Sequence, residues 1–323
     1  MASSTTPSNT TPLNGALLPA EKFSDPKVTA SGQERAAVSL RQLETLWFNT
    51  GTLCNLTCKN CYIESSPTND RLSYLTREDV SGYLDELQYN DWPTREIGFT
   101  GGEPFMNPDI IAMLEDCLSW AYHVLVLTNA MKPMEHHRQA LSRLNGKYSD
   151  RLGLRVSVDH YSPAGHEAER GTASWEPMVE GLKWLSDNGL SFQVAGRTTS
   201  GETEASLRHG YATFFKAHNI RCDAADPAQL VLFPEMDETA DVAEITTACW
   251  TLLGVNPDDM MCASSRMIVR PKGAKKPVVM PCTLLAYDRA FEMGHKVTKA
   301  TGPVALNHPH CARFCVLGGA SCS

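Results

Sequence analysis

Three cysteines stand close together in residues 53–62, which read Leu-Cys-Asn-Leu-Thr-Cys-Lys-Asn-Cys-Tyr. Cys54, Cys58 and Cys61 form a C-x3-C-x2-C array. Thiolates are soft ligands that select iron–sulfur clusters, zinc or copper(I), and a closed zinc site or a fully ligated cubane takes four of them. A 4Fe–4S cubane held by these three cysteines would keep one iron free to bind another ligand.

The same positions fall at i, i+4 and i+7, so they could instead form one buried face of a helix. Residues 43–48 favour a strand, and weak helix formers crowd the stretch that follows. These are Asn49, Thr50, Gly51, Thr52, Asn55, Thr57 and Asn60. A helix is therefore disfavoured, and a structural zinc knuckle stays open as an alternative to a cluster.

The composition is ordinary for a globular protein. The 323 residues are 42% hydrophobic and 20% charged, with a formal net charge of -8. Because the chain is acidic and has no Lys/Arg cluster, we expect no nucleic-acid partner. No apolar run approaches the roughly 20 residues that a membrane-spanning helix needs, so we expect no membrane partner.

The chain has eleven cysteines, an odd number. It is not small, and it shows no secretory signal, so thiols or metal ligands are favoured over a disulfide framework. This indicates a reducing, cytoplasmic location. The polar, Ser/Thr-rich start of the chain cannot bury enough apolar surface to offset the entropy of ordering it, so we expect residues 1–38 to be a disordered arm.

Beyond residue 38, short apolar runs alternate with longer amphipathic stretches. The expected strands are residues 43–48, 96–100, 123–128, 153–159, 191–198 and 229–233. The expected helices are residues 76–89, 108–120, 134–144, 174–188 and 203–217. Thr76 and Asp79 are placed to form a capping box, and Pro108 to open the second helix. The alternation predicts an α/β fold with parallel strands and right-handed crossovers, as either an open sheet or a barrel.

The second strand is followed by Thr100-Gly101-Gly102-Glu103-Pro104. Two glycines at this place allow the backbone to approach a ligand closely, and a glutamate can accept a hydrogen bond from an ammonium group. A tight turn with a solvated glutamate is the alternative. The glycines match neither the phosphate loop nor the dinucleotide-binding fingerprint, so nucleotide-phosphate binding is disfavoured.

Together, the cysteine array and the Gly-Gly-Glu-Pro loop resemble the radical S-adenosylmethionine (SAM) superfamily over about residues 43–233. The resemblance implies a partial (β/α)6 TIM-type barrel and a 4Fe–4S cluster on Cys54, Cys58 and Cys61, with SAM bound at the open iron. It also implies that Gly101, Gly102 and Glu103 contact the methionine amino group of SAM. Asn60 departs from the family, in which many members have an aromatic residue before the last cysteine.

Further cofactor contacts are implied by position at the ends of later strands. Ser157 and Asp159 could bind the ribose hydroxyls, with a polar strand end as the alternative. Arg197 could bind the methionine carboxylate in a bidentate manner, with a surface ion pair as the alternative. Asn129, after the third strand, is a weaker candidate. Asp159 and His160 are the catalytic candidates, and Tyr161 and His310 could also face the cavity.

The last part of the chain is rich in cysteine and resembles the short SPASM/twitch-like extension of many superfamily members. It offers five cysteines, too few for two fully ligated cubanes, so one auxiliary 4Fe–4S cluster is expected. The resemblance favours Cys262 and Cys282 with two of Cys311, Cys315 and Cys322, and a zinc ribbon is the alternative. We therefore expect a barrel over residues 39–234 and a small cysteine-rich domain over residues 235–323.

The substrate is not predicted in detail. The resemblance implies reductive cleavage of SAM to a 5'-deoxyadenosyl radical, a reductant such as flavodoxin or ferredoxin, and hydrogen abstraction for the oxidation or cross-linking of a peptide or a small molecule. The N-terminal arm is too short and polar for a leader-peptide recognition domain, and no cobalamin-binding domain precedes the barrel. A non-catalytic electron-transfer protein and a zinc-stapled binding module remain alternatives.

Overall fold

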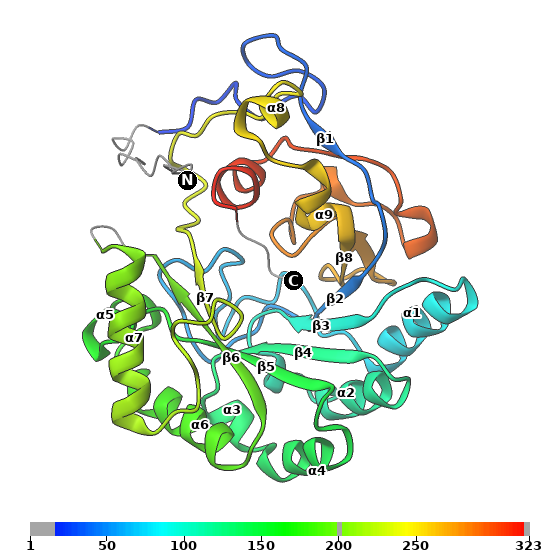
Figure 1. Ribbon diagram of the computed structural model, residues 1–323. Helices are drawn as coiled ribbons and strands as arrows, with labels where there is room; N and C mark the ends of the chain where they lie inside the picture. The colour runs from blue at the N-terminus through cyan, green and yellow to red at the C-terminus, as the bar shows by residue number, and fades with distance from the viewer. Residues whose placement is uncertain (1–16, 199–201, 320–323) are drawn as a thin grey trace, which may run out of the picture.

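The computed structural model describes residues 17–198 and 202–319. Its centre is an eight-stranded sheet in the order β7-β6-β5-β4-β3-β2-β8-β9. The six strands of the expected barrel are β2 (Thr45–Asn49), β3 (Glu96–Thr100), β4 (His123–Thr128), β5 (Leu152–Ser157), β6 (Ser191–Arg197) and β7 (Leu230–Phe233). All six run parallel, and the sheet curves without closing (Figure 1), which confirms the partial (β/α)6 barrel.

Helices cover the outer face of this curved sheet (Figure 1). They are α1 (Arg77–Tyr89), α2 (Ile110–Ser119), α3 (Lys132–Glu135), α4 (Arg138–Tyr148), α5 (Pro163–Arg170), α6 (Trp175–Asp187) and α7 (Glu204–His218). The predicted capping box is present: the Thr76 side chain accepts from the Asp79 amide, and the Asp79 side chain accepts from the Thr76 amide. None of the helices in the described residues is long and apolar enough to cross a membrane.

Three helical features differ from the expectation. The single helix expected at residues 134–144 is divided between α3 and α4, where the His137 ring lies 3.2 Å from the Phe105 carbonyl oxygen. α2 begins two residues after Pro108, because the Asn107 side chain holds the Asp109 amide in a turn. α5 was not predicted, although Ser162 caps its first turn and proline stands at its first position.

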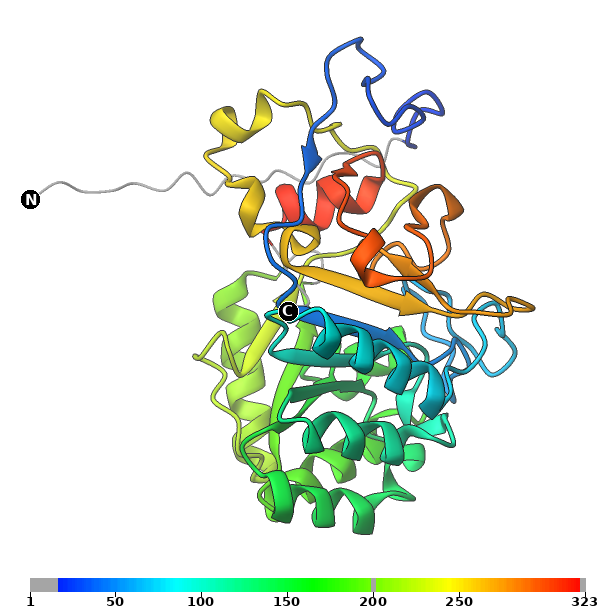
Figure 2. The same ribbon diagram turned by 90° about the vertical axis from the view of Figure 1, so that its right-hand side faces the viewer.

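Two strands of the C-terminal part of the chain continue the central sheet. β8 (Ser265–Val269) pairs with β2 in parallel, and β9 (Val278–Met280) pairs with β8 in antiparallel fashion. Figure 2 shows the remaining C-terminal elements, including α8 (Cys249–Leu253) and α9 (Met261–Ser264), as a layer above the barrel. The expected boundary near residue 235 therefore separates two layers that share one sheet.

Residues 17–38 lie against this C-terminal layer. β1 (Ala37–Val38) pairs with β10 (Val304–Ala305), and the Arg35 guanidinium is buried against Glu244 and the Leu306 carbonyl. The expected disorder of residues 1–38 is thus wrong for residues 17–38, because their partners lie more than 200 residues away. Residues 1–16 fall outside the described part of the chain.

The core has two halves that meet at β2. Leu46 and Phe48 are fully buried on the side of the helices, whereas Trp47, equally buried, points to the C-terminal layer. A side chain at Gly98 would lie 2.2 Å from the Trp47 ring, so the neighbouring strand needs glycine there. One strand therefore anchors both layers, and the loop that follows it carries the first cysteines.

Candidate functional site

A cavity opens at the carboxyl ends of the parallel strands, where ligand sites of such barrels form. Polar groups reach it from the ends of four successive strands: Thr100 from β3, Thr128 from β4, Ser157 from β5 and Arg197 from β6. The wall also includes the following residues: Cys54, Cys58, Asn60, Cys61, Gly101, Gly102, Asn129, Asp159, Arg170, Phe233, Met236, Leu284 and Phe314. Most of the residues that the sequence predicts for the site therefore line one cavity.

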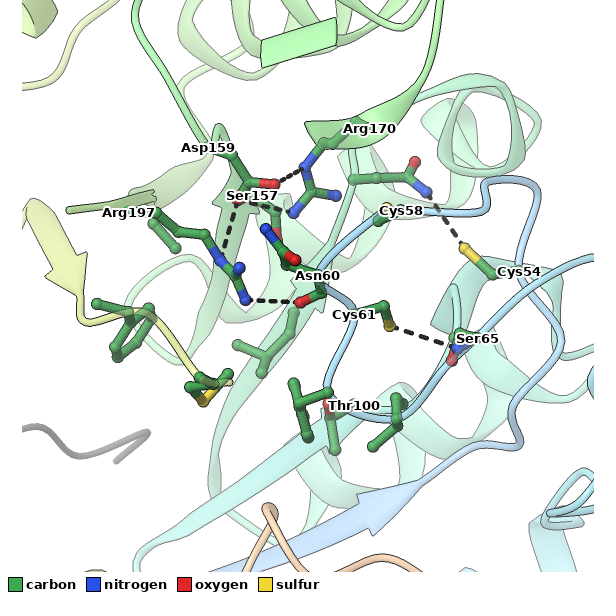
Figure 3. Close-up of a pocket in the computed structure, with 18 of the residues that line it drawn as sticks. Cys54, Cys58, Asn60, Cys61, Ser65, Thr100, Ser157, Asp159, Arg170 and Arg197 are labelled. Atoms are coloured by element: carbon green, nitrogen blue, oxygen red, sulfur yellow. Dashed lines mark hydrogen bonds and ion pairs between the residues drawn. The ribbon is translucent and has the colours of Figure 1, made fainter. Parts of the chain in front are cut away.

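The three cysteines of the first array line this cavity together (Figure 3). The Leu56 amide donates to the Cys54 sulfur over 3.4 Å, and the Ser65 amide donates to the Cys61 sulfur over 3.4 Å. Such donors stabilise negative charge on sulfur. α5 fixes the middle of the loop, because Glu169 accepts from the Asn60 side chain over 2.7 Å.

The donor set suits a metal cluster. Burial raises the pKa of the Cys54 thiol to about 12 and also raises the pKa of Cys58, so a bound cation would be needed to hold these thiolates. Within the described residues, no three Cys, His, Asp or Glu side chains gather closely enough around one point to hold a single ion. The thiolates of a cubane bind different iron atoms, so they lie farther apart than the ligands of one zinc ion. Three thiols in one cavity thus fit the ligand set that a cubane with one open iron takes.

The two glycines of the second loop lie directly against the cysteine loop. A side chain at Gly102 would lie 2.1 Å from the Leu53 carbonyl oxygen, and one at Gly101 would lie 2.5 Å from the Gly51 carbonyl oxygen. Gly101 also has φ +134°, which few other residues adopt. These positions therefore need glycine for the two loops to meet beside the cavity.

Glu103 lies behind the cavity wall rather than on it. Its buried carboxylate accepts from the Asn129 amide over 2.8 Å, the Thr128 hydroxyl over 2.9 Å and the Phe105 amide over 3.2 Å. Burial raises the pKa of Glu103 to about 7, although these three hydrogen bonds act in the opposite direction. The sequence resemblance implies that Glu103 contacts the amino group of SAM. In the structure the Glu103 carboxylate instead joins the β3 loop to the β4 loop.

Beside the cysteine loop, two arginines converge on Asp159 (Figure 3). Arg170 Nε lies 2.9 Å from Asp159 Oδ2, and Arg197 Nε lies 3.9 Å from Asp159 Oδ1. Burial alone would raise the pKa of Asp159, but the two guanidinium groups hold it below its usual value. Arg197 also donates to the Asn60 carbonyl over 2.9 Å, which brings this cluster against the cysteine loop.

His160 and Tyr161 do not line this cavity. His160 Nε2 lies 2.8 Å from Glu202, its Nδ1 lies 2.8 Å from the Ser162 hydroxyl, and the Tyr161 hydroxyl donates to Glu202 over 3.0 Å. Both side chains join the loop after β5 to the loop after β6. His160 is therefore placed as a structural residue, which argues against its candidacy as a catalytic one.

A second, smaller cavity lies in the C-terminal layer and gathers four cysteines. Cys262 and Cys282 line this cavity together with Cys311 and Cys315, which lie in the π-helical turn Cys311–Val316. Burial raises the pKa of Cys262 to about 11 and that of Cys311 further, with Cys282 and Cys262 adding to the effect on Cys311. Cys322 lies outside the described residues, and Cys117, Cys222 and Cys249 line neither cavity.

A protein-family model for the radical SAM superfamily matches residues 48–207, about half of the chain. This match covers the cysteine loop and the whole of β3, β4, β5 and β6. The chain belongs to the radical SAM superfamily. The missing fourth ligand of the first cysteine array thus has an explanation, because in this superfamily SAM binds at the open iron.

Relatives and solved structures agree with this membership. The antilisterial bacteriocin subtilosin biosynthesis protein AlbA of Bacillus subtilis is 30% identical over 169 residues, which cover 52% of this chain and 35% of AlbA. SuiB of Streptococcus suis bound to its precursor peptide SuiA is similar in fold, with a TM-score of 0.60 at 13% identity over 82% of this chain and 66% of SuiB. The same holds for anSMEcpe with bound AdoMet, with a TM-score of 0.57 at 13% identity over 79% of each chain. The matched region spans about a third of AlbA and two thirds of SuiB.

Two arginines of the radical SAM cavity, Arg155 and Arg170, were missed in the sequence. Arg170 ends the unpredicted helix α5 and reaches the cavity from there. Its only sequence signal is the Ser162-Pro163 helix start, which would place a helix on the same loop as Asp159. The site therefore has three arginines on its wall: Arg155, Arg170 and Arg197.

Proposed function

We propose that this protein is a radical SAM enzyme that removes a hydrogen atom from a peptide substrate, for oxidation or cross-linking. The observation that supports this most is the joint placement of Cys54, Cys58 and Cys61 in one cavity that also presents paired arginines beside the cysteine loop. When bound, a 4Fe–4S cluster and SAM supply a 5'-deoxyadenosyl radical, given an electron from a donor such as flavodoxin or ferredoxin.

The protein groups then bind and orient the cofactor. Arg170 and Arg197 suit the methionine carboxylate, since guanidinium groups bind carboxylates in a planar, bidentate manner. Asp159 is already paired with Arg170, so we assign it a positioning role for the arginines. Ser157 lines the cavity at the end of β5 and is our candidate for the ribose hydroxyls.

The other side of the cavity is apolar and suits the exclusion of water. Phe233 stacks on Phe314 with ring centroids 5.5 Å apart, and Met236 and Leu284 lie on the same wall. A reactive carbon radical needs such surroundings, because water and competing hydrogen donors are kept away. These residues come from β7 and the C-terminal layer, so this layer closes the substrate side of the barrel.

We further propose that Cys262, Cys282, Cys311 and Cys315 bind an auxiliary 4Fe–4S cluster. These four cysteines line one cavity in the C-terminal layer, and a fully ligated cubane takes four thiolates. Such a cluster could accept an electron from the substrate or bind it. Cys322 lies outside the described residues, so this proposal assigns the cluster to the other four cysteines.

A peptide is our preferred substrate class. AlbA acts in the biosynthesis of a bacteriocin, and SuiB was solved with a precursor peptide, so two similar proteins are linked to peptides by their names. The oxidation of a small molecule is the competing possibility. The two differ in whether mass loss appears in an added peptide or in a low-molecular-weight compound.

Anaerobic reconstitution tests the function. Purified protein with iron and sulfide should hold about eight irons and eight sulfides per chain, as expected for two cubanes, and should hold no zinc. After addition of reductant and SAM, it should produce 5'-deoxyadenosine. Zinc in place of iron would support the binding-module alternative, and iron without 5'-deoxyadenosine would support the electron-transfer alternative.

A further inference from the structure

A second groove adjoins the cavity and opens to the surface. It runs along the seam between the cysteine loop, residues 235–238 after β7, and residues 284–288 and 308–310 of the C-terminal layer. Asn60, Cys61, Met236 and Leu284 line both the groove and the cavity. The groove and the cavity therefore adjoin along these side chains.

Carboxylates dominate this groove. Glu64, Glu235, Asp237, Glu238 and Asp288 face Lys59 and Arg71. Arg71 is already paired with Glu64 at 2.7 Å and lies over the Tyr287 ring. Four carboxylates then remain against one lysine.

Three of these carboxylates lack an ion pair in the part of the chain that the structure describes. Within residues 17–198 and 202–319, Glu235, Asp237 and Asp288 form no ion pair. Glu235 and Asp237 are exposed on the rim, and Asp288 is half-buried across the groove. Negative charge along both sides of a groove concentrates a cationic ligand and speeds its association.

A buried histidine between the groove and the smaller cysteine cavity provides a second observation. His310 is only 2% exposed, lines the groove, and its Nδ1 has no hydrogen-bond partner among the described residues. Its Nε2 lies 3.7 Å from Glu238. Buried polar atoms are rarely left without a partner, so a polar group of a ligand would complete this site.

We propose that this groove binds the arm of a peptide substrate that has lysine or arginine side chains next to the residue held in the cavity. This inference rests on the proposed function and names its substrate class more closely. An extended chain places successive side chains on opposite sides, so cationic side chains can reach both acidic rims while the backbone passes His310. The groove would then select substrates by charge before the chemistry begins.

Binding of two synthetic peptides to the reconstituted holoenzyme tests this selection. Both are short Gly/Ser peptides with a fluorescent label; one has several lysines and the other has glutamates at the same positions. Wild-type protein should bind the lysine peptide about tenfold or more tightly than the glutamate peptide, with affinity falling as salt rises. Equal binding of the two peptides, or no binding of either, would overturn the inference.

Two triple variants locate the effect. The groove variant Glu235→Gln/Asp237→Asn/Asp288→Asn keeps the local hydrogen bonds of Asp237 and Asp288, because an amide oxygen still accepts. Its affinity for the lysine peptide should be about tenfold lower than that of the wild type. The control variant Glu176→Gln/Glu180→Gln/Asp187→Asn removes the same amount of charge from the exposed face of α6, away from the groove (Figure 1). Its affinity for the lysine peptide should equal that of the wild type. An equal loss in both variants would assign the effect to net charge and contradict a groove.

The same samples separate the two proposals. If wild-type protein forms 5'-deoxyadenosine but does not prefer the lysine peptide, the groove inference fails and the proposed function stands. If no 5'-deoxyadenosine forms, the proposed function fails whatever the peptides do. Should the groove variant not fold, the comparison of the two peptides on the wild type still decides.

Discussion

The Arg170 Nε atom lies 2.9 Å from Asp159 Oδ2, inside the cavity where β5 and α5 meet. Neither residue is exposed enough for water to screen this pair, since their side chains are 14% and 8% accessible. The pair therefore holds Arg170 in place beside the cysteine loop. The pair links helix α5, which the sequence did not predict, to the end of strand β5, which the sequence predicted as part of the site.

Removal of one partner of this pair should destabilise the fold. Arg170→Met leaves the buried Asp159 carboxylate with only the more distant Arg197, and should lower the free energy of unfolding by roughly 3 kcal/mol. The double variant Asp159→Asn/Arg170→Met should recover much of this stability, measured by urea denaturation of the metal-free protein. Both the single and the double variant should fail to bind SAM in equilibrium dialysis, because both lack Arg170. Recovered SAM binding in the double variant would contradict a cofactor role for Arg170.

Glu103 predicts a pH dependence of stability. Its pKa is raised by burial to about 7, against an ordinary value of 4.5, so the folded protein holds a proton that the unfolded chain releases between these two pH values. The free energy of unfolding should therefore contain a part that falls as pH rises from about 4.5 to 7, by roughly 3 kcal/mol in total.

Glu103→Gln should remove this part. The difference between the wild-type and variant curves, measured by urea denaturation of the metal-free protein at several pH values, isolates it from other titrating groups. The exposed Glu180→Gln serves as the matched control and should retain the wild-type slope. A Glu103→Gln curve parallel to the wild type would show that Glu103 is not titrating in this range.

The glycine next to the cysteine loop should tolerate no side chain. Gly102→Ala places a Cβ 2.1 Å from the Leu53 carbonyl oxygen, so the loop that carries Cys54 must move. Iron at the first site should fall severalfold after reconstitution. Gly82→Ala is the control: it lies inside α1 with open space around it, and alanine there should stabilise the helix by about 1 kcal/mol. Full iron occupancy in Gly102→Ala would contradict the packing of the two loops.

The four cysteines of the second cavity should behave as one set. Cys311→Ala should lose about half of the iron and leave the first cluster in place. Cys322→Ala should retain all of it, because four thiolates are already present without Cys322. Iron and sulfide analysis of each variant checks this. If Cys322→Ala loses as much iron as Cys311→Ala, Cys322 is a ligand of the auxiliary cluster.

Local sequence signals predicted the barrel well. The strands at residues 96–100 and 123–128 are confirmed to the residue, because apolar runs bounded by glycine and polar residues have clear ends. The cavity-lining positions of Cys54, Cys58, Cys61, Gly101 and Gly102 follow from the motifs alone. Such signals depend only on neighbouring residues.

The missed features depend on distant partners. Arg35 is buried by Glu244 and Leu306, and β8 joins the sheet beside β2, yet no local pattern in either segment specifies these contacts. Glu103 reads as a ligand by motif, but its carboxylate is used by the β4 loop. Long-range contacts of this kind decide which motif residues face the cavity and which support it.

The rate of 5'-deoxyadenosine formation in matched cysteine variants tests the central claim most directly. Cys58 lines the cavity, whereas Cys249 is half-buried in α8 and lines neither cysteine cavity. With SAM and reductant under anaerobic conditions, Cys249→Ala should form 5'-deoxyadenosine at the wild-type rate, and Cys58→Ala should form none above background. An undiminished rate in Cys58→Ala, or no product from the wild type, would contradict a radical SAM enzyme built on this cysteine loop.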